Sequence, residues 1–250
     1  MSDPTSITPG PVPPAANKQA IVFFDAQNLY FSAQEAFRVR EPNFDPVLLA
    51  QHICGERGWE VKQVRFYTGV PGASEQPRWH RYWTAKLRRL RNQKVEIFAP
   101  PLRYRRKEAE LPITPEAARW VRLLLPDGSQ LPRGPITVLT REGREVPPGT
   151  VLSVQVGEEK GVDVRFALDF IRATIEGAFD VGVLFTQDQD HAEAVREAKT
   201  IAKSQNRTIE LFSVYPEGCL NARGVNGTTW VQISEAVYSA CIDTRNYFGS

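Results

Sequence analysis

Several features that define common protein classes are scarce or missing in this sequence of 250 residues. It has three cysteines and three histidines, and neither set has the spacing of a zinc site or of a disulfide framework. No apolar run approaches the roughly 20 residues that cross a bilayer. No charged and apolar leader precedes a small-residue cleavage site. These absences argue against a secreted or membrane protein and predict a cytoplasmic protein with reduced thiols.

The motifs of several enzyme classes are also absent. The sequence contains no GxxxxGK[ST] phosphate loop, no GxGxxG after its first apolar run and no GxSxG nucleophile elbow. The first apolar run ends in DAQN, which lacks the second aspartate that a haloacid-dehalogenase-type phosphatase needs. Chemistry based on these motifs is therefore excluded.

The composition is that of a folded chain with an uneven charge distribution. Hydrophobic residues make up 42% of the chain and the net charge is +2, which allows a buried core. The Pro-rich residues 1–18 are predicted to be a disordered leader. Between Lys62 and Lys107 there are 13 Lys and Arg residues against two acidic ones. Such a segment suits a polyanionic partner, and a merely solvated surface is the alternative.

Apolar runs alternate with helical patterns along most of the chain. AIVFFD is apolar on both faces, which predicts a central strand of a covered parallel sheet. Further strands are expected in WEVKQVRFYTGV, KVEIFAPPL, DVGVLFT and TIELFSVY, and helices over residues 29–38, 46–56, 78–91, 160–177 and 190–204. This alternation predicts a three-layer α/β fold with a mostly parallel sheet over residues 19–247. Residues 102–156 break the rhythm with turn-rich pieces such as ARWVRLLL, PITVLT and TVLSVQV, which predicts an inserted small β-rich subdomain.

Carboxylates follow two of these expected strands. Asp25 ends AIVFFD, Asp188 and Asp190 follow DVGVLF, and Asp163 lies in the opening turn of the helix expected from Lys160. Ligands of α/β sheets collect at the carboxyl ends of strands, near the point where the strand order reverses. Aspartates that converge there would repel one another without a cation, and hard oxygen ligands suit Mg²⁺ or Mn²⁺. Each aspartate also has an alternative role as a helix cap or as a charge that complements a helix dipole.

Other polar residues accompany these carboxylates. Asn28 would orient a metal-bound water or a phosphate, or would cap the next helix. Thr186 offers a hydroxyl at a strand end, with packing as its alternative role. His191 could act as an acid or base beside Asp190, but it stays outside the catalytic set, because a polar residue in a first helical turn needs no function. Asp169 falls within an apolar stripe and is expected to pair with an arginine, with a role in the site as the alternative.

Several of these segments resemble the NYN domain family, which comprises PIN-like nucleases also found in LabA-type bacterial proteins. FFDAQNLY resembles the family's D-x-x-N opening, EEKGVDVRFALDF its EKGvDv segment, and DVGVLFTQDQDHAEAV its segment with two closely spaced aspartates. RGVNGTTWVQISEAVYSACIDTRNYF resembles the C-terminal part of one bacterial subgroup, so that the likeness covers roughly residues 20–100 and 157–247. There are two departures: Gln187 and Gln189 replace small residues, and His191 stands where an apolar residue is usual.

The resemblance implies a PIN-like fold and metal-dependent cleavage of RNA with Mg²⁺ or Mn²⁺. It assigns the acidic, metal-binding role to Asp25, Asp163, Asp188 and Asp190, with Asn28 as a supporting catalytic residue. The RNA backbone would then contact basic residues, namely Arg81, Arg88, Arg91, Arg103, Arg105, Arg106, Lys107 and Lys160. The alternative is a non-catalytic RNA-binding or scaffold module with a degenerate metal site. Both interpretations place the protein in the cytoplasm with RNA as partner, and leave a homo-oligomer open.

Overall fold

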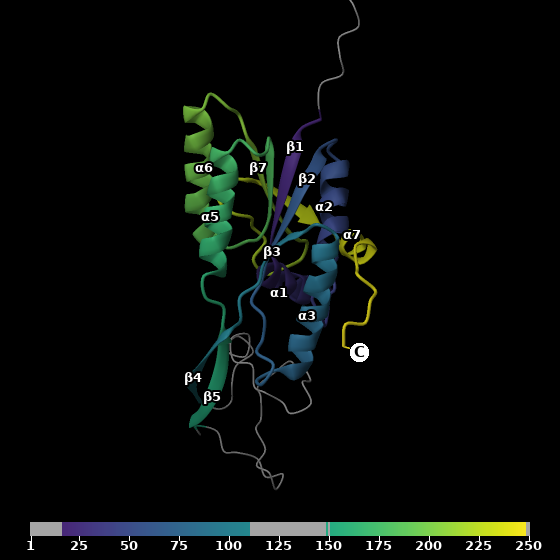
Figure 1. The fold of residues 1–250 in the computed structure, drawn as a ribbon, viewed down its shortest axis with the longest axis vertical. Coiled ribbons are helices and arrows are strands. Elements are labelled where there is room, and N and C mark those ends of the chain that lie inside the picture. Colours follow the sequence, from purple (N-terminus) through teal and green to yellow (C-terminus); the bar gives the residue numbers. More distant parts are fainter. Residues whose placement is uncertain (1–16, 111–148, 150, 249–250) are drawn as a thin grey trace, which may run out of the picture.

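A computed structural model describes residues 17–110, 149 and 151–248 of the chain, with only the backbone described for 106–110 and 151–155. Six parallel strands form one sheet in the order β3-β2-β1-β6-β7-β8 (Figure 1). They are β1 (Gln19–Asp25), β2 (Glu60–Tyr67), β3 (Glu96–Phe98), β6 (Val181–Phe185), β7 (Glu210–Pro216) and β8 (Thr229–Ile233). The predicted α/β fold with a parallel sheet is therefore confirmed.

β1 is the central strand because its side chains are apolar on both faces. Every residue from Ala20 to Asp25 is buried. Val22 and Phe24 enter the core on one face of the sheet, and Ile21 and Phe23 enter the core on the other. The interpretation of AIVFFD as a doubly covered strand is confirmed.

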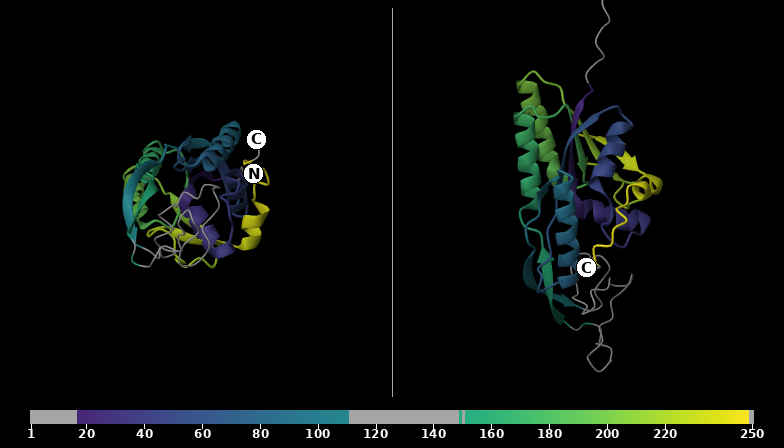
Figure 2. Two further views of the ribbon diagram at one scale, coloured as in Figure 1. Left: turned by 90° about the horizontal axis from the view of Figure 1, so that it is seen from below. Right: turned by 45° about the vertical axis from the view of Figure 1, so that its right-hand side comes forward.

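Helices cover both faces of the sheet, so that the fold has three layers (Figures 1 and 2). One face carries α1 (Ala26–Phe37), α2 (Pro46–Gly55), α3 (Pro77–Asn92) and α7 (Glu235–Ala240). The other carries α5 (Val162–Ile175) and α6 (Ala192–Ser204). The helix predicted over 190–204 starts with a short 3₁₀ turn, η1 (Gln189–His191), and the one predicted from residue 29 starts at Ala26 because Asp25 caps it.

The basic helix α3 uses part of its charge to hold the fold together. Lys86 is fully buried and its Nζ donates to the backbone oxygen of Phe44 at 2.9 Å. Burial lowers the pKa of Lys86 to about 7. Arg89 bridges the buried carboxylates of Asp45 and Asp243, at 3.1 and 3.4 Å. These two cations are therefore structural and are not available to a ligand.

The strand order reverses between β1 and β6. From β1 the chain continues to β2 and β3 on one side, whereas β6 is followed by β7 and β8 on the other. The two strands pair in parallel from Ala20 with Val181 to Phe24 with Phe185, and thus end at the same edge. That edge is where a sheet of this kind holds its ligand.

The predicted β-rich insertion contains one antiparallel strand pair. β4 (Arg103–Glu110) pairs with β5 (Val151–Glu158), from Arg103 opposite Glu158 to Glu110 opposite Val151. The pair projects from the end of the sheet at which β1 ends (Figure 1). The segments ARWVRLLL and PITVLT, and the leader up to residue 16, lie outside the described residues. The domain limits stay predictions.

The three cysteines are free and buried, as expected for reduced thiols. Burial raises the pKa of the Cys54 thiol to about 11, so this side chain is a thiol and not a thiolate at neutral pH. Within the described residues, no helix is long and apolar enough to cross a membrane. The cytoplasmic location stays a prediction.

Candidate metal centre

Asp25 is a buried carboxylate at the junction of β1 and α1. Its Oδ1 accepts a hydrogen bond from the backbone N–H of Asn28 at 3.0 Å, and its Oδ2 accepts one from the Thr186 hydroxyl at 3.1 Å. Only 6% of the residue is exposed. Burial above all raises the pKa of Asp25 to about 8, and the charges of Glu159 and Asp163 add to the effect, although the two hydrogen bonds oppose it. The ionised form therefore lacks a sufficient positive partner.

Asp163 reaches the same place from the first turn of α5. The chain enters this helix through Gly161, whose φ of 77° is in the left-handed region that glycine adopts without strain. The Asp163 side chain is exposed to solvent. Partial burial raises its pKa, the nearby charges of Asp188 and Asp190 raise it further, and His191 lowers it. Asp163 is thus an accessible carboxylate in a negative environment.

His191 ends η1 and is 2% exposed. Its ring stacks on Phe166 with a centroid distance of 4.3 Å and an interplanar angle of 30°. Its Nε2 is buried and has no hydrogen-bond partner among the described residues. Burial lowers the pKa of His191, although the charges of Asp188 and Asp163 oppose this effect. A neutral imidazole with an unused ring nitrogen therefore lies in the core of the site.

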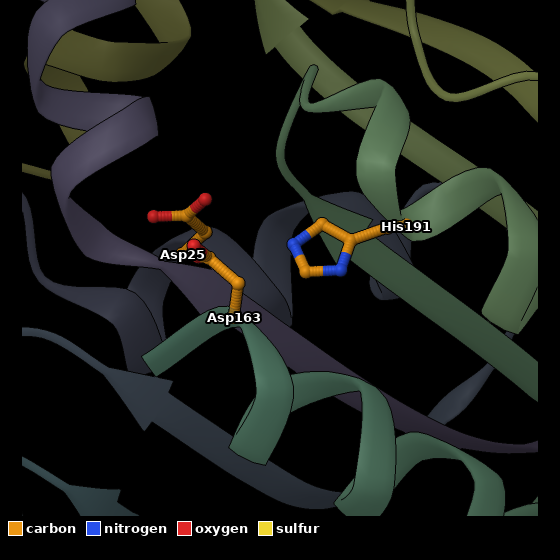
Figure 3. Close-up of side chains that lie close together, drawn as sticks. All are labelled: Asp25, Asp163 and His191. Carbon is orange, nitrogen blue, oxygen red and sulfur yellow. The ribbon is translucent and has the colours of Figure 1, made fainter. Parts of the chain in front are cut away.

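These three side chains converge on one point (Figure 3). Asp25, Asp163 and His191 each offer a ligand atom, and these atoms lie within 4.8 Å of one another. They come from the end of β1, the start of α5 and the turn before α6. The structure thus brings Asp25 and Asp163 together. It also adds His191, for which the sequence holds one signal, a polar residue where NYN domains have an apolar one.

Asp188 and Asp190 lie at the same edge but outside this group of ligand atoms in the described part of the chain. Asp188 caps η1, since its Oδ1 accepts from the backbone N–H of Asp190 at 2.9 Å. Asp190 is exposed. Both charges still act on the site, because they raise the pKa of Asp163. The capping alternative is realised for Asp188, and a role as metal ligand stays a prediction for both residues.

The ends of β1 and β6 are joined by polar contacts. The Thr186 hydroxyl, which donates to Asp25, accepts from the backbone N–H of Asp188 at 3.1 Å. The side-chain oxygen of Asn28 accepts from the backbone N–H of Gln187 at 3.0 Å. Asn28 and Thr186 therefore position the residues around Asp25, and a catalytic role for Asn28 stays a prediction.

The two glutamines that depart from the family pattern hold a neighbouring segment, residues 221–226. Gln187 Nε2 donates to the backbone oxygen of Arg223 at 3.0 Å, and Gln189 Nε2 donates to that of Gly224 at 2.9 Å. Gln187 is buried, with 5% of its surface exposed. Both side chains thus hold this segment in place beside the site.

Glu159 is a further acidic residue near the site that sequence reasoning missed. It follows β5, and its carboxylate accepts from the backbone N–H of Gly69. Its charge contributes to the raised pKa of Asp25. The residue falls within the EEKGVDV segment of the resemblance, but nothing in that motif marks it as a neighbour of Asp25.

Asp169 lies outside the site and has the arginine partner that the sequence led us to expect. Its Oδ2 lies 2.9 Å from Arg165 Nε, one helical turn before it. The same oxygen accepts from the Tyr67 hydroxyl at 3.1 Å. The expected arginine pair is therefore confirmed, and Asp169 is structural.

Six of the predicted RNA-contacting residues are exposed, namely Arg81, Arg88, Arg91, Arg103, Arg105 and Lys160. Arg105 and Lys160 lie 3.4 and 3.5 Å from the Glu158 carboxylate. The three of these residues that belong to α3 have no acidic partner among the described residues. For Arg106 and Lys107 only the backbone, in β4, is described, so their predicted contacts lie outside the described side chains.

Comparisons with known proteins do not assign a function to the chain. No known protein family matches the sequence. No functionally curated protein matches it either. Among solved structures, the chain is similar to a protein of unknown function from Vibrio parahaemolyticus, with 15% identity over 90% of this chain and 98% of that one. The TM-score is 0.44, and this likeness carries no functional argument.

Proposed function

We propose that the protein is a metal-dependent ribonuclease that hydrolyses RNA phosphodiester bonds at the edge where β1 and β6 end. The observation that carries the proposal is the convergence of Asp25, Asp163 and His191, whose ligand atoms lie within 4.8 Å of one another at the reversal of the strand order. The resemblance of FFDAQNLY, EEKGVDVRFALDF and the TQDQD segment to NYN nucleases supports the choice of RNA.

The residues present fit a divalent cation. A helix cap alone does not explain why Asp25 is buried close to two other acidic residues, since caps act well at exposed helix ends. A buried carboxylate with a pKa of about 8, beside an imidazole nitrogen without a partner, has two donors that a cation would satisfy together. Glu159, Asp188 and Asp190 add negative charge around this position.

The side chains of the site have distinct parts in the proposed reaction. A divalent cation, when bound, would lower the pKa of a water and stabilise charge on the phosphate. Asp25 is fixed by Thr186 and Asn28, so it presents its carboxylate without reorganisation. Asp163 is exposed, which leaves the site open to a phosphodiester. Asp190, exposed beside it, would position the attacking water.

Two elements that carry exposed arginines lie at the end of the sheet that holds the site. α3 and the β4–β5 pair both extend past the edge where β1 ends (Figure 1). The exposed arginines of α3 and β4 would contact the RNA phosphates, and contacts of this kind neutralise charge without reading the base sequence. Binding would therefore be strong at low salt and tolerant of sequence.

The experiment that tests the proposal measures cleavage of a labelled single-stranded RNA by the full-length protein with Mg²⁺, with Mn²⁺ and with excess chelator. We expect Asp25→Asn and Asp163→Asn to lower the rate by about 10²-fold or more, the scale for loss of one preorganised charged group. Glu176→Gln, which removes an exposed carboxylate at the far end of α5, is the matched control and should leave the rate unchanged.

Cleavage that persists in excess chelator would contradict the metal mechanism. RNA binding of normal strength without any metal-dependent cleavage would instead favour the alternative, a non-catalytic RNA-binding module.

A further inference from the structure

We propose that His191 binds the cation directly through Nε2, which makes the centre a mixed nitrogen and oxygen site that prefers Mn²⁺ and the later first-row metals to Mg²⁺. This inference rests on the metal centre of the proposed function and deepens it, since it names the class of cation. Neither the sequence pattern nor the resemblance assigns His191 to the site.

The position of the ring is that of a ligand. Its nearest ring nitrogen points toward Asp25 and Asp163 (Figure 3). The three ligand atoms lie within 4.8 Å of one another, yet Nε2 makes no hydrogen bond to either carboxylate. Ligand atoms that share one ion at about 2.0–2.2 Å lie about 3–4.4 Å apart. His191 Nε2 is thus not bonded to either carboxylate, and all three atoms lie close enough to share one ion with at most a small contraction.

The unused nitrogen argues against a purely structural role for His191. A buried polar atom without a partner is rare, and it calls for an explanation such as a ligand. Packing on Phe166 requires only the face of the ring and would be served equally well by an apolar side chain. A histidine at this position supplies in addition a donor atom directed at two carboxylates, and a metal ion is the ligand class that such a set binds.

The ring is also held in place before any ion arrives. Phe166 packs on its face with a centroid distance of 4.3 Å, and the backbone N–H of His191 donates to the backbone oxygen of Asp188 at 3.3 Å. Only 2% of the residue is exposed to solvent, so the ring does not swing freely between water and the site. A preorganised nitrogen ligand strengthens metal binding because the side chain loses little conformational entropy when the ion binds.

The nature of the donor then decides which cation binds. Mg²⁺ takes oxygen ligands and keeps several waters, and an imidazole in its coordination sphere contributes little to its binding affinity. Imidazole binds transition metals well, and affinity for a site with nitrogen and oxygen donors rises from Mn²⁺ towards Co²⁺ and beyond. A site with aspartates alone lacks this bias, so His191 would be the residue that sets it.

The test compares dissociation constants of the full-length chain for Mg²⁺, Mn²⁺ and Co²⁺, measured by calorimetric titration. The variant is His191→Leu, which keeps an apolar contact with Phe166, and the matched variant is Asp163→Asn, which removes an oxygen ligand. In His191→Leu, we expect the ratio of the Mg²⁺ constant to the Mn²⁺ constant to fall by about tenfold or more, with a larger fall for Co²⁺. Asp163→Asn should weaken binding of all three ions alike. An unchanged ratio in His191→Leu overturns the proposal.

A second measurement needs only the wild-type chain. With ring-labelled histidine the spectrum contains three imidazoles, His52, His80 and His191, because the chain has no others. Saturation with diamagnetic Zn²⁺ should shift one Nε2 resonance at one equivalent, and His52→Gln and His80→Gln identify it by elimination. If no resonance of His191 responds while metal-dependent cleavage persists, the ligand assignment is wrong and the ribonuclease stands. If the wild type binds no ion at all, the proposed function fails with it.

Discussion

The backbone N–H of Gln187 donates to the side-chain oxygen of Asn28 at 3.0 Å, which fastens the first turn of α1 to the segment that leaves β6. The two residues flank the point where the strand order reverses, so this contact joins the two halves of the sheet beside Asp25. Asn28, which the sequence predicts at the site, therefore fixes the position of the segment that follows β6.

The first prediction concerns this contact. Asn28→Ala should lower the free energy of unfolding by about 1–3 kcal/mol, because the buried N–H of Gln187 loses its acceptor. Asn92→Ala, at the exposed end of α3, should change it by less than about 0.5 kcal/mol. Urea denaturation of both variants provides the measurement. Equal stability of the two variants would show that the contact does not hold the strand ends together.

The second prediction concerns the pH dependence of stability in chelator. The pKa of Asp25 rises on folding from 3.8 to about 8, so between these values the folded chain binds a proton that the unfolded chain has released. The contribution of Asp25 to the free energy of unfolding therefore decreases as pH rises through this window. Asp25→Asn removes that contribution, and its stability relative to the wild type should increase from pH 4 to pH 8.

Metal should reverse this comparison. At pH 8 the wild type should gain about 2.7 kcal/mol at a hundredfold excess of Mn²⁺ over its dissociation constant, and Asp25→Asn much less. Denaturation at several pH values, with chelator and with Mn²⁺, measures both effects. A pH-independent difference between the proteins in chelator would mean that Asp25 titrates normally.

The third prediction concerns the exposed arginines of α3. One variant replaces three arginines by glutamine, at Arg81, Arg88 and Arg91. A control with the same change of charge replaces three exposed cations of α5 and α6 by glutamine, at Arg172, Arg196 and Lys203. The α3 variant should bind single-stranded RNA less tightly at all sequences, and the plot of log K against log salt should flatten by about 0.7 for each phosphate that is no longer neutralised. If both variants flatten it equally, α3 is a solvated surface and not an RNA-binding one.

The fourth prediction concerns the glutamine that holds residues 221–226. In Gln187→Ala the backbone oxygen of Arg223 loses its donor. Amide hydrogens of residues 221–226 should then exchange faster, while the strands keep their protection. Gln51→Ala, on the exposed side of α2, should leave this segment unchanged. Exchange measured by mass spectrometry compares the two variants, and an unaltered segment in Gln187→Ala would contradict the assigned role.

The fold was predictable where a local pattern carries its own explanation. AIVFFD is apolar at every position before its final aspartate, and only a strand covered on both faces buries all of it. The placement of Asp25 and Asp188 at one edge follows from the same pattern, because the carboxyl ends of parallel strands meet there. Asp163 lies in the first turn of α5, which the chain enters through Gly161.

The part of the site that the sequence did not reveal depends on packing between distant segments. His191 belongs to the group because η1 turns its ring onto Phe166, 25 residues earlier in the chain, and no local pattern specifies that packing. The same limit applies to charge. The helical pattern places Arg88 opposite the apolar face, and Arg88 is exposed, but Lys86 is fully buried because it contacts the backbone oxygen of Phe44, a distant residue that no local pattern specifies.

The order of the site residues along the chain has a consequence for biosynthesis. Asp25 ends the first strand, whereas Asp163 and His191 enter with α5 and the turn after β6. A ribosome that has completed β1, β2 and β3 has made one side of the sheet and one of the three converging groups. β1 can pair with β6 only after β6 has been synthesised, and Asp163 and His191 are made shortly before and shortly after that strand. The centre therefore cannot assemble before residue 191 has been made, and the growing polypeptide stays without it over the first three quarters of its synthesis.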